Sequence, residues 1–164
     1  MSDPHQLRPA VQADAAFLAD MVVEAANWRA GGARPRHEVV ASAEHRRYIA
    51  GWMRPADAGF VAVEDSGVPI GAAWYRMLPQ NDPGFGYIGT GVPELIIGVR
   101  PIWRGRGVGR TLLRALVEHA AAQGHRRISL SVERDNYAAS LYRGEGFVVT
   151  GTGLLRQTMV RRVG

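Results

Sequence analysis

Three glycines lie close together in the segment Arg104-Gly105-Arg106-Gly107-Val108-Gly109, and this composition suits the binding of an anion. Glycine lets the backbone approach a phosphate closely, because no Cβ stands in the way. The apolar run Leu95–Val99 precedes the segment and predicts a buried strand. A helix is expected from about Val108 to Gln123, and its first free N–H groups would point at the anion. The pattern therefore predicts a phosphate-binding turn between a strand and a helix.

Two common phosphate loops do not fit this turn. A Walker A loop would need Gly at 104 and Lys at 110, where the chain has Arg104 and Arg110. The dinucleotide fingerprint could take Gly105 and Gly107 as its first two glycines, but its third position is again Arg110. Neither ligand class is therefore expected here.

A complete G-x-G-x-x-G pattern occurs elsewhere, over Gly84-Phe85-Gly86-Tyr87-Ile88-Gly89. It follows Asp82-Pro83 rather than a strand, and Gly91 and Pro93 come after it instead of a helix. Without a strand before it and a helix after it, the pattern indicates a flexible loop and not a nucleotide site.

A second motif follows the glycine turn by about one strand. It consists of Asn136-Tyr137-Ala138-Ala139-Ser140-Leu141-Tyr142 and then Gly146-Phe147. This motif is similar to the Asn-x-x-Ala-x-x-Leu-Tyr-x-x-x-Gly-Phe element of the Gcn5-related N-acetyltransferases, the GNAT superfamily. Arg104, Gly107 and Gly109 resemble the Arg/Gln-x-x-Gly-x-Gly/Ala loop of the same family. The chain departs from the family in one respect, because Asp135 occupies the position, seven residues before the tyrosine, where many members have the asparagine.

The resemblance implies that the chain binds acetyl-CoA and passes the acetyl group directly to an amine. It also implies that the turn holds the pyrophosphate, that the end of the preceding strand pairs with the pantetheine arm, and that an N–H near Val99 polarises the thioester carbonyl. The implied cofactor-binding residues are Ile97, Gly98, Val99, Arg104, Gly105, Arg106, Gly107, Val108, Gly109, Arg110 and Asn136. No metal is implied. The acyl donor could also be a longer acyl-CoA.

Direct transfer needs an acid for the departing sulfur and a base for the amine. Tyr142 is the implied acid, because a phenol with a pKa of about 10 is protonated at neutral pH. An alkyl amine is also largely protonated there, and Glu94, at the start of the central strand, is the first candidate for its base, either directly or through a water. Glu133 and Asp82 remain alternatives. Some relatives have a glutamate two positions before Glu133, where this chain has Ser131.

The acceptor amine is expected to bind between the segment Asn27–Arg36 and the long loop Leu78–Val92, which is rich in Pro, Gly, Asn and Asp. Aromatic side chains that could line such a pocket are Trp28, Trp74, Tyr75, Phe85 and Tyr87. These residue types do not identify the amine, which could belong to a small molecule or to a peptide.

The elements that must position these residues follow from hydrophobic periodicity and turn signals. Before the glycine turn we predict a strand over Leu7–Val11, a helix capped by Asp14 and running to about Asn27, a break at Gly31–Pro35, a helix over Glu38–Met53, and strands over Phe60–Glu64 and Ile70–Met77 joined at Ser66-Gly67. The strand and helix around the turn follow, and Gly124 ends that helix. After it we predict a strand over Arg127–Val132, a short helix over Tyr137–Arg143, and strands near Phe147–Thr150 and Leu154–Val160.

The segment 95–132 predicts two parallel strands with a right-handed crossover, whereas the hairpin before it predicts antiparallel strands. We therefore expect an α/β fold, more narrowly an α+β mixed sheet, as a single domain over 1–164. The family resemblance implies a GNAT-like fold with a central mixed β-sheet of about six to seven strands, flanked by about four helices.

Composition narrows the function classes further. The chain has no cysteine, which excludes disulfides, thiolate zinc sites and cysteine nucleophiles. Its net charge of +5 comes from arginines alone, and these are scattered, which favours a mildly basic surface over nucleic-acid binding. Neither a signal-like apolar run at the start nor a stretch long enough for a bilayer is present, so we expect a cytoplasmic protein without a membrane partner.

Two other function classes stay open. A non-catalytic acyl-CoA-binding sensor or partner module would keep the glycine turn but would need neither Tyr142 nor a base, so the presence of Tyr142 favours an enzyme. A nucleic-acid-binding domain that uses the arginine excess would bind with a steep salt dependence, but no known motif supports it. A homodimer is implied by the family resemblance alone.

Overall fold

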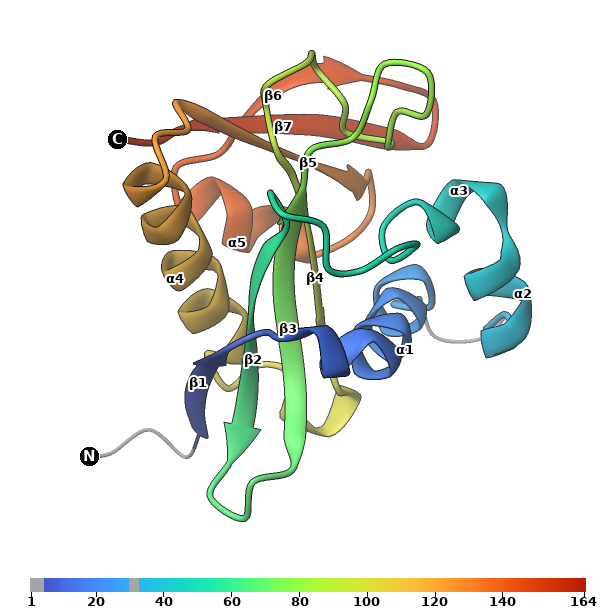
Figure 1. Ribbon diagram of the computed structural model, residues 1–164. Coiled ribbons are helices and arrows are strands. Elements are labelled where there is room, and N and C mark those ends of the chain that lie inside the picture. The colour runs from blue at the N-terminus through green and yellow to red at the C-terminus, as the bar shows by residue number, and fades with distance from the viewer. Residues whose placement is uncertain (1–4, 30–32) are drawn as a thin grey trace.

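The computed structural model describes residues 5–29 and 33–164 and contains a seven-stranded sheet in the order β1-β2-β3-β4-β5-β7-β6 (Figure 1). In chain order the elements are β1 (His5–Pro9), the 3-10 turn η1 (Gln12–Asp14), α1 (Ala15–Ala26), α2 (Arg36–Ala41), α3 (Ala43–Arg46), β2 (Ala58–Glu64), β3 (Pro69–Arg76), β4 (Glu94–Val99), the 3-10 turn η2 (Pro101–Trp103), α4 (Val108–Ala122), β5 (Arg127–Glu133), α5 (Ala138–Gly144), β6 (Val148–Thr152) and β7 (Arg156–Arg162). The predicted mixed sheet flanked by helices is confirmed, with one helix more than expected.

The pairing of the strands divides the sheet into two parts. Strands β1 to β4 pair antiparallel, and so do β5, β7 and β6, while β4 and β5 are the predicted parallel neighbours. The ladder between β4 and β5 contains the single residue pair Glu94–Ser129. Past this pair the two strands run apart, and in Figure 1 β4 continues downward while β6 and β7 lie across the upper end of the sheet.

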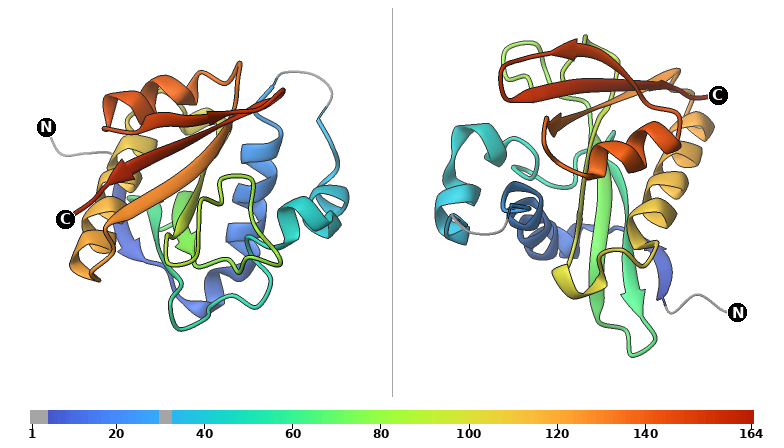
Figure 2. Two further views of the ribbon diagram at one scale, coloured as in Figure 1. Left: turned by 90° about the horizontal axis from the view of Figure 1, so that it is seen from above. Right: turned by 180° about the vertical axis from the view of Figure 1, so that it is seen from behind.

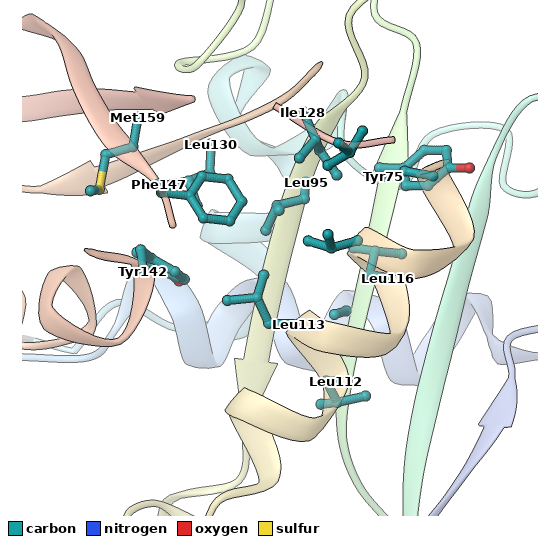
Figure 3. Packing of buried hydrophobic residues seen from close by; sticks show 14 of the residues in the cluster. Tyr75, Leu95, Leu112, Leu113, Leu116, Ile128, Leu130, Tyr142, Phe147 and Met159 are labelled. Carbon is teal, nitrogen blue, oxygen red and sulfur yellow. The ribbon is translucent and has the colours of Figure 1, made fainter. Parts of the chain in front are cut away.

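One face of the sheet is covered by α4 and α5. The buried residues of α4 recur every three or four positions, as expected for a helix with one apolar side; they are Val108, Leu112, Leu113, Leu116, Val117 and Ala120. Figure 3 shows Leu113 and Leu116 extending from α4 toward the strands, with Tyr142 and Phe147 beside them in the same cluster. Gly124, with a left-handed φ of 87°, follows the end of α4 as predicted.

The other face is covered by α1, α2 and α3, which lie on the opposite side of the sheet in Figure 1. Helix α1 packs directly on β4, and the two backbones approach most closely at Gly98. A Cβ added at Gly98 would lie 2.9 Å from the Cβ of Met21 and closer still to the Met21 carbonyl oxygen. The absence of a side chain at Gly98 therefore sets how near α1 can lie to the sheet.

Two local predictions about the N-terminal third are wrong in detail. The helix expected over Glu38–Met53 is two short helices, because Ser42 adopts an extended backbone and its Oγ accepts the N–H of His45 at 3.3 Å. A hydroxyl that satisfies a local N–H in this way competes with helix continuation. Asp14 does precede α1, but its carboxylate accepts the N–H of Val11 at 2.7 Å and pairs with Arg8, rather than capping the helix.

Strand β1 begins and ends two residues before the strand predicted over Leu7–Val11. The predicted break at Gly31–Pro35 lies partly outside the described residues, since 30–32 are not among them. Within the ranges 5–29 and 33–164, no helix has both the length and the apolar character to cross a membrane.

The contact at Gly98 gives a prediction about stability. Gly98→Ala should lower the free energy of unfolding by about 1–3 kcal/mol, because the new methyl group overlaps Met21 and must push α1 from β4. Urea unfolding measures the change. Gly144→Ala is the matched control, since a Cβ there meets nothing within 4 Å. Equal stability of the two variants would contradict the close packing of α1.

Candidate functional site

A cleft of about 420 Å³ opens where β4 and β5 run apart. All six residues of β4 line it, and residues of β5 from Leu130 to Glu133 form the facing wall. On its other side β4 is fully paired with β3, so the edge of β4 that faces β5 is the one left without a strand partner. An unpaired strand edge presents backbone donors and acceptors, which suits an extended ligand with amide groups.

The glycine turn closes one end of this cleft. Gly105 and Gly107 have left-handed φ values of 73° and 85°, and a Cβ added at either would meet nothing within 4 Å. The requirement for glycine is therefore conformational and not a matter of space. Gly107 is the N-cap of α4, and among the described residues no side chain caps this helix. Its first N–H groups and the positive end of its dipole therefore face the cleft without a protein acceptor, as an anion site requires.

The arginines of the turn have separate contacts. Arg104 donates from Nε to the Val99 carbonyl at 3.2 Å and pairs with Glu24 of α1 at 3.2 Å. Its side chain thus ties the turn to β4 and α1. Arg110 lines the cleft and pairs with Glu145 at 3.2 Å.

Almost all the residues predicted to bind the cofactor line this one cleft. Arg106 does not, and its guanidinium stacks over Trp103, 5.1 Å from the ring centroid. Asn136 lies on the cleft wall before α5, and its Oδ1 accepts the N–H of Ala138 at 2.9 Å. Cofactor binding by these residues remains a prediction.

Tyr142 reaches the cleft from α5. Its ring packs edge-to-face against Phe147, with centroids 6.1 Å apart, and belongs to the apolar cluster under α4 (Figure 3). Burial raises the pKa of the Tyr142 hydroxyl well above its usual range. The hydroxyl therefore keeps its proton at neutral pH and can donate it.

Glu94 lies at the first residue of β4 and is only 3% exposed. Its Oε2 accepts two hydrogen bonds, from the hydroxyl of Tyr48 at 2.6 Å and from the N–H of Gly86 at 2.9 Å. Its Oε1 has no hydrogen-bond partner in the described part of the chain. Burial raises the pKa of Glu94, while the two hydrogen bonds oppose that rise. A carboxylate with a raised pKa and one free oxygen has the properties of a general base.

The loop with the G-x-G-x-x-G pattern packs against Glu94. A Cβ at Gly84 would lie 2.7 Å from the Tyr48 hydroxyl, and one at Gly86 would lie 2.6 Å from the Leu130 carbonyl carbon. No helix follows the pattern, as expected. Its glycines allow the loop to approach Glu94 and β5, and both views in Figure 2 show the loop beside the C-terminal strands.

The aromatic residues proposed for the acceptor pocket separate into two groups. Trp28 and Phe85 line the cleft, whereas Trp74, Tyr75 and Tyr87 do not. Trp74 and Tyr75 are fully buried in β3, one under each face of the sheet, and β4 separates them from the cleft. These two residues, which could have lined a pocket, are therefore core residues and not part of the cleft wall.

Of the two alternative bases, one lines the cleft and the other does not. Glu133 lines the cleft and accepts the indole N–H of Trp28. Asp82 is exposed on the loop, pairs with Arg47 at 3.3 Å, and is not part of the cleft wall.

Three cleft residues, Tyr48, His45 and Arg156, gave no signal in the sequence. Tyr48 precedes Glu94 by 46 residues and lies just after α3. His45 is buried, and burial lowers its pKa, which favours the neutral ring. Arg156 opens β7 and donates to Ser131 across the cleft wall. No local motif connects these residues, because their proximity depends on how the loops return to the sheet.

Comparisons with known proteins agree with this geometry. The acetyltransferase (GNAT) family profile matches residues 17–147. A mycothiol acetyltransferase of Streptomyces avermitilis is 35% identical over 65% of this chain and 32% of its own length, and one of Cellulomonas flavigena is 31% identical over 79% and 37%. The chain thus spans about a third of the length of these curated relatives.

Solved structures share the fold over nearly the whole chain. The PaiA N-acetyltransferase of Thermoplasma acidophilum, solved in complex with coenzyme A, has a TM-score of 0.70 at 20% identity and covers 99% of both chains. A Gcn5-related N-acetyltransferase of Kribbella flavida has a TM-score of 0.67 at 24% identity and covers 98% of both.

The buried carboxyl gives a prediction about pH and stability. Because the pKa of Glu94 is higher in the folded chain than in the unfolded chain, the stability it contributes is full below the unfolded pKa and is lost as the pH rises through the folded pKa. As the pH rises from about 4 to about 8, the free energy of unfolding should therefore fall less in Glu94→Gln than in the wild type. This window contains the usual glutamate pKa. Urea unfolding at several pH values measures this, with Glu118→Gln on exposed α4 surface as the control. Parallel curves for Glu94→Gln and the wild type would contradict the raised pKa.

Proposed function

Because this chain belongs to the acetyltransferase (GNAT) family, we propose that it moves an acetyl group from acetyl-CoA directly to a primary amine of a small molecule or peptide. One observation carries the proposal. A single cleft contains an uncapped helix N-terminus, a buried phenol that keeps its proton, and a buried carboxylate with a raised pKa. These are the three groups that direct acyl transfer to an amine requires.

The residues of the turn and of β4 suit the cofactor. The N-terminus of α4 offers its free N–H groups to the pyrophosphate, and the open edge of β4 offers backbone groups to the pantetheine amides. The backbone N–H of Arg100 donates to the Ile70 carbonyl oxygen of β3 at 2.8 Å and so points away from the cleft. Since N–H groups alternate along a strand, those of Ile97 and Val99 point toward the cleft. Acetyl-CoA, when bound there, supplies the acetyl group as an activated thioester.

The side chains then divide the proton transfers between them. Glu94 takes a proton from the acceptor ammonium, directly or through one water, and frees the nitrogen lone pair for attack on the carbonyl carbon. The N–H of Val99 stabilises the negative charge that develops on the carbonyl oxygen. As the C–N bond forms and the C–S bond breaks, Tyr142 donates its proton to the sulfur. The nitrogen loses its second proton to solvent as the amide forms, and the products are an amide and a free thiol. Solvent then returns a proton to Tyr142 and takes the proton held by Glu94.

The relatives leave the acceptor open. The similar curated proteins are named for mycothiol, but this chain covers only about a third of them. Neither of the two structural neighbours is named for an acceptor, and a likeness at 20–24% identity shows the fold alone.

The test of this function combines binding with turnover. Acetyl-CoA should raise the melting temperature, and some member of an amine library should release CoA thiol in its presence. Stabilisation without thiol release by any amine would favour an acyl-CoA sensor instead. An unchanged melting temperature would refute acetyl-CoA binding and with it the proposed function.

Tyr142 provides a prediction about the acid. Tyr142→Phe should lower kcat by about 100-fold or more, since a positioned general acid contributes roughly this much, while the Kd for acetyl-CoA changes little. Thiol release and calorimetry measure the two quantities. Tyr75→Phe is the matched control, because it removes a hydroxyl from the core outside the cleft. Unchanged turnover in Tyr142→Phe would exclude this residue as the acid.

Tyr48 provides a prediction about the base. The hydrogen bond from Tyr48 lowers the pKa of Glu94, so Tyr48→Phe should raise it further. A base acts when it is deprotonated, and the acidic limb of the profile of kcat/KM against pH should therefore move to higher pH. In Glu94→Gln the same limb should disappear as activity falls. An unshifted limb in Tyr48→Phe would show that another group is the base, with Glu133 the next candidate.

A further inference from the structure

Arg156, the first residue of β7, places a guanidinium group in the cleft wall. Its Nε donates to Ser131 Oγ of β5 at 2.7 Å, and its Cζ lies 4.1 Å from the centroid of the Phe85 ring. The strand and the loop therefore hold the guanidinium from two directions. This contact orients a planar group and leaves its two terminal nitrogens available.

The charge of Arg156 forms no ion pair within the described residues, although Glu133 lies opposite it in the β5–β7 register, because the Glu133 carboxylate accepts the indole N–H of Trp28. Within residues 5–29 and 33–164, no carboxylate oxygen lies within 4.0 Å of the Arg156 guanidinium nitrogens, which is the limit for an ion pair. The two other arginines of the cleft wall differ, since Arg104 pairs with Glu24 and Arg110 with Glu145, both at 3.2 Å. A partly buried cation without an internal partner gains much from an anionic ligand, because the pair forms in a medium of low dielectric constant.

This guanidinium also lies close to the proposed chemistry. Its positive charge acts on the titration of both Glu94 and Tyr142, lowering the pKa of each against the larger effect of burial. Along β5, Ser131 lies two residues beyond Ser129, the partner of Glu94, which corresponds to about 6.6 Å of strand. That spacing suits a small molecule with its amine near Glu94 and an anionic group near Arg156.

We infer that Arg156 binds a carboxylate, or an oxyanion of similar shape, on the acceptor, and that the preferred acceptors are amino acids or related zwitterions. The terminal N–H groups of a guanidinium match the two oxygens of a carboxylate. The amine end of this inference rests on the proposed function, whereas anion binding at Arg156 does not require transfer. Neutral His45, also in the cleft wall, adds no second cation.

The test compares each common amino acid that has a primary α-amine with its amide, which lacks the α-carboxylate but keeps the amine. The wild type should have a higher kcat/KM for the acid than for the amide of each acceptor that it uses. Arg156→Gln should lower kcat/KM for the acid roughly 10- to 100-fold, the range expected for a hydrogen-bonded charge. It should lower kcat/KM for the amide much less, because the amide is affected only through the pKa values of Glu94 and Tyr142. Arg162→Gln, which removes an exposed arginine at the other end of β7, is the matched control.

The contrary result is equally clear. Preference of the wild type for amides, or an equal loss for acids and amides in Arg156→Gln, would overturn the inference. Arg156→Lys covers the case in which Arg156→Gln does not fold, since it keeps the charge and should keep part of the acid preference.

Calorimetric titration of the same pairs into the CoA-loaded protein separates this inference from the proposed function. An acid preference in binding that depends on Arg156, without any thiol release, would support the anion site and refute the transfer. Equal binding of acids and amides would overturn the anion site even if transfer to amines occurs.

Discussion

The separation of β4 from β5 is the constraint on which the rest of the molecule depends. Parallel neighbours in a sheet normally continue their ladder, yet here it ends after Glu94 and Ser129. Each strand then needs other partners for the backbone groups on its free edge. β5 is held away by its full antiparallel pairing with β7, and β4 by its pairing with β3 and its packing under α1 at Gly98. The open edge between them is therefore a fixed property of the sheet, available to a ligand.

The cleft has two ends of different construction. The end at the glycine turn consists of residues adjacent in sequence, from β4 through Gly107 into α4, so its form is largely local. The other end is assembled from the α3 region, the loop 78–92, β5 and β7. Three distant segments contribute Tyr48, Phe85 and Arg156. Tyr48 donates to Glu94, the N–H of Phe85 donates to the Tyr48 hydroxyl, and the Arg156 guanidinium stacks on the Phe85 ring. Under the proposed function, the local end would bind the cofactor and the assembled end the acceptor.

The buried Glu94 illustrates how the site opposes stability. An ionised carboxyl in an enclosed position loses hydration, and the two hydrogen bonds to one oxygen recover only part of that loss. The unpaired oxygen of Glu94 adds to the same effect, and so does the guanidinium of Arg156, which forms no ion pair within residues 5–29 and 33–164. Groups of this kind are expected where a protein must exchange protons or bind an ionic ligand, because a fully satisfied group has little further affinity.

The sequence by itself determined the elements with strong local signals, which were the hairpin of β2 and β3, the strand β4, the glycine turn and α4. Periodicity and glycine conformation act within a few residues, so they can be read from a single chain. The helix at 38–53 failed because Ser42 diverts the backbone through a hydroxyl contact that periodicity does not detect. Only the tertiary structure decided that Tyr48 and Arg156 belong to the cleft and that Trp74 and Tyr75 do not. Those outcomes depend on how far β4 and β5 separate and where distant loops return, and long-range packing sets both.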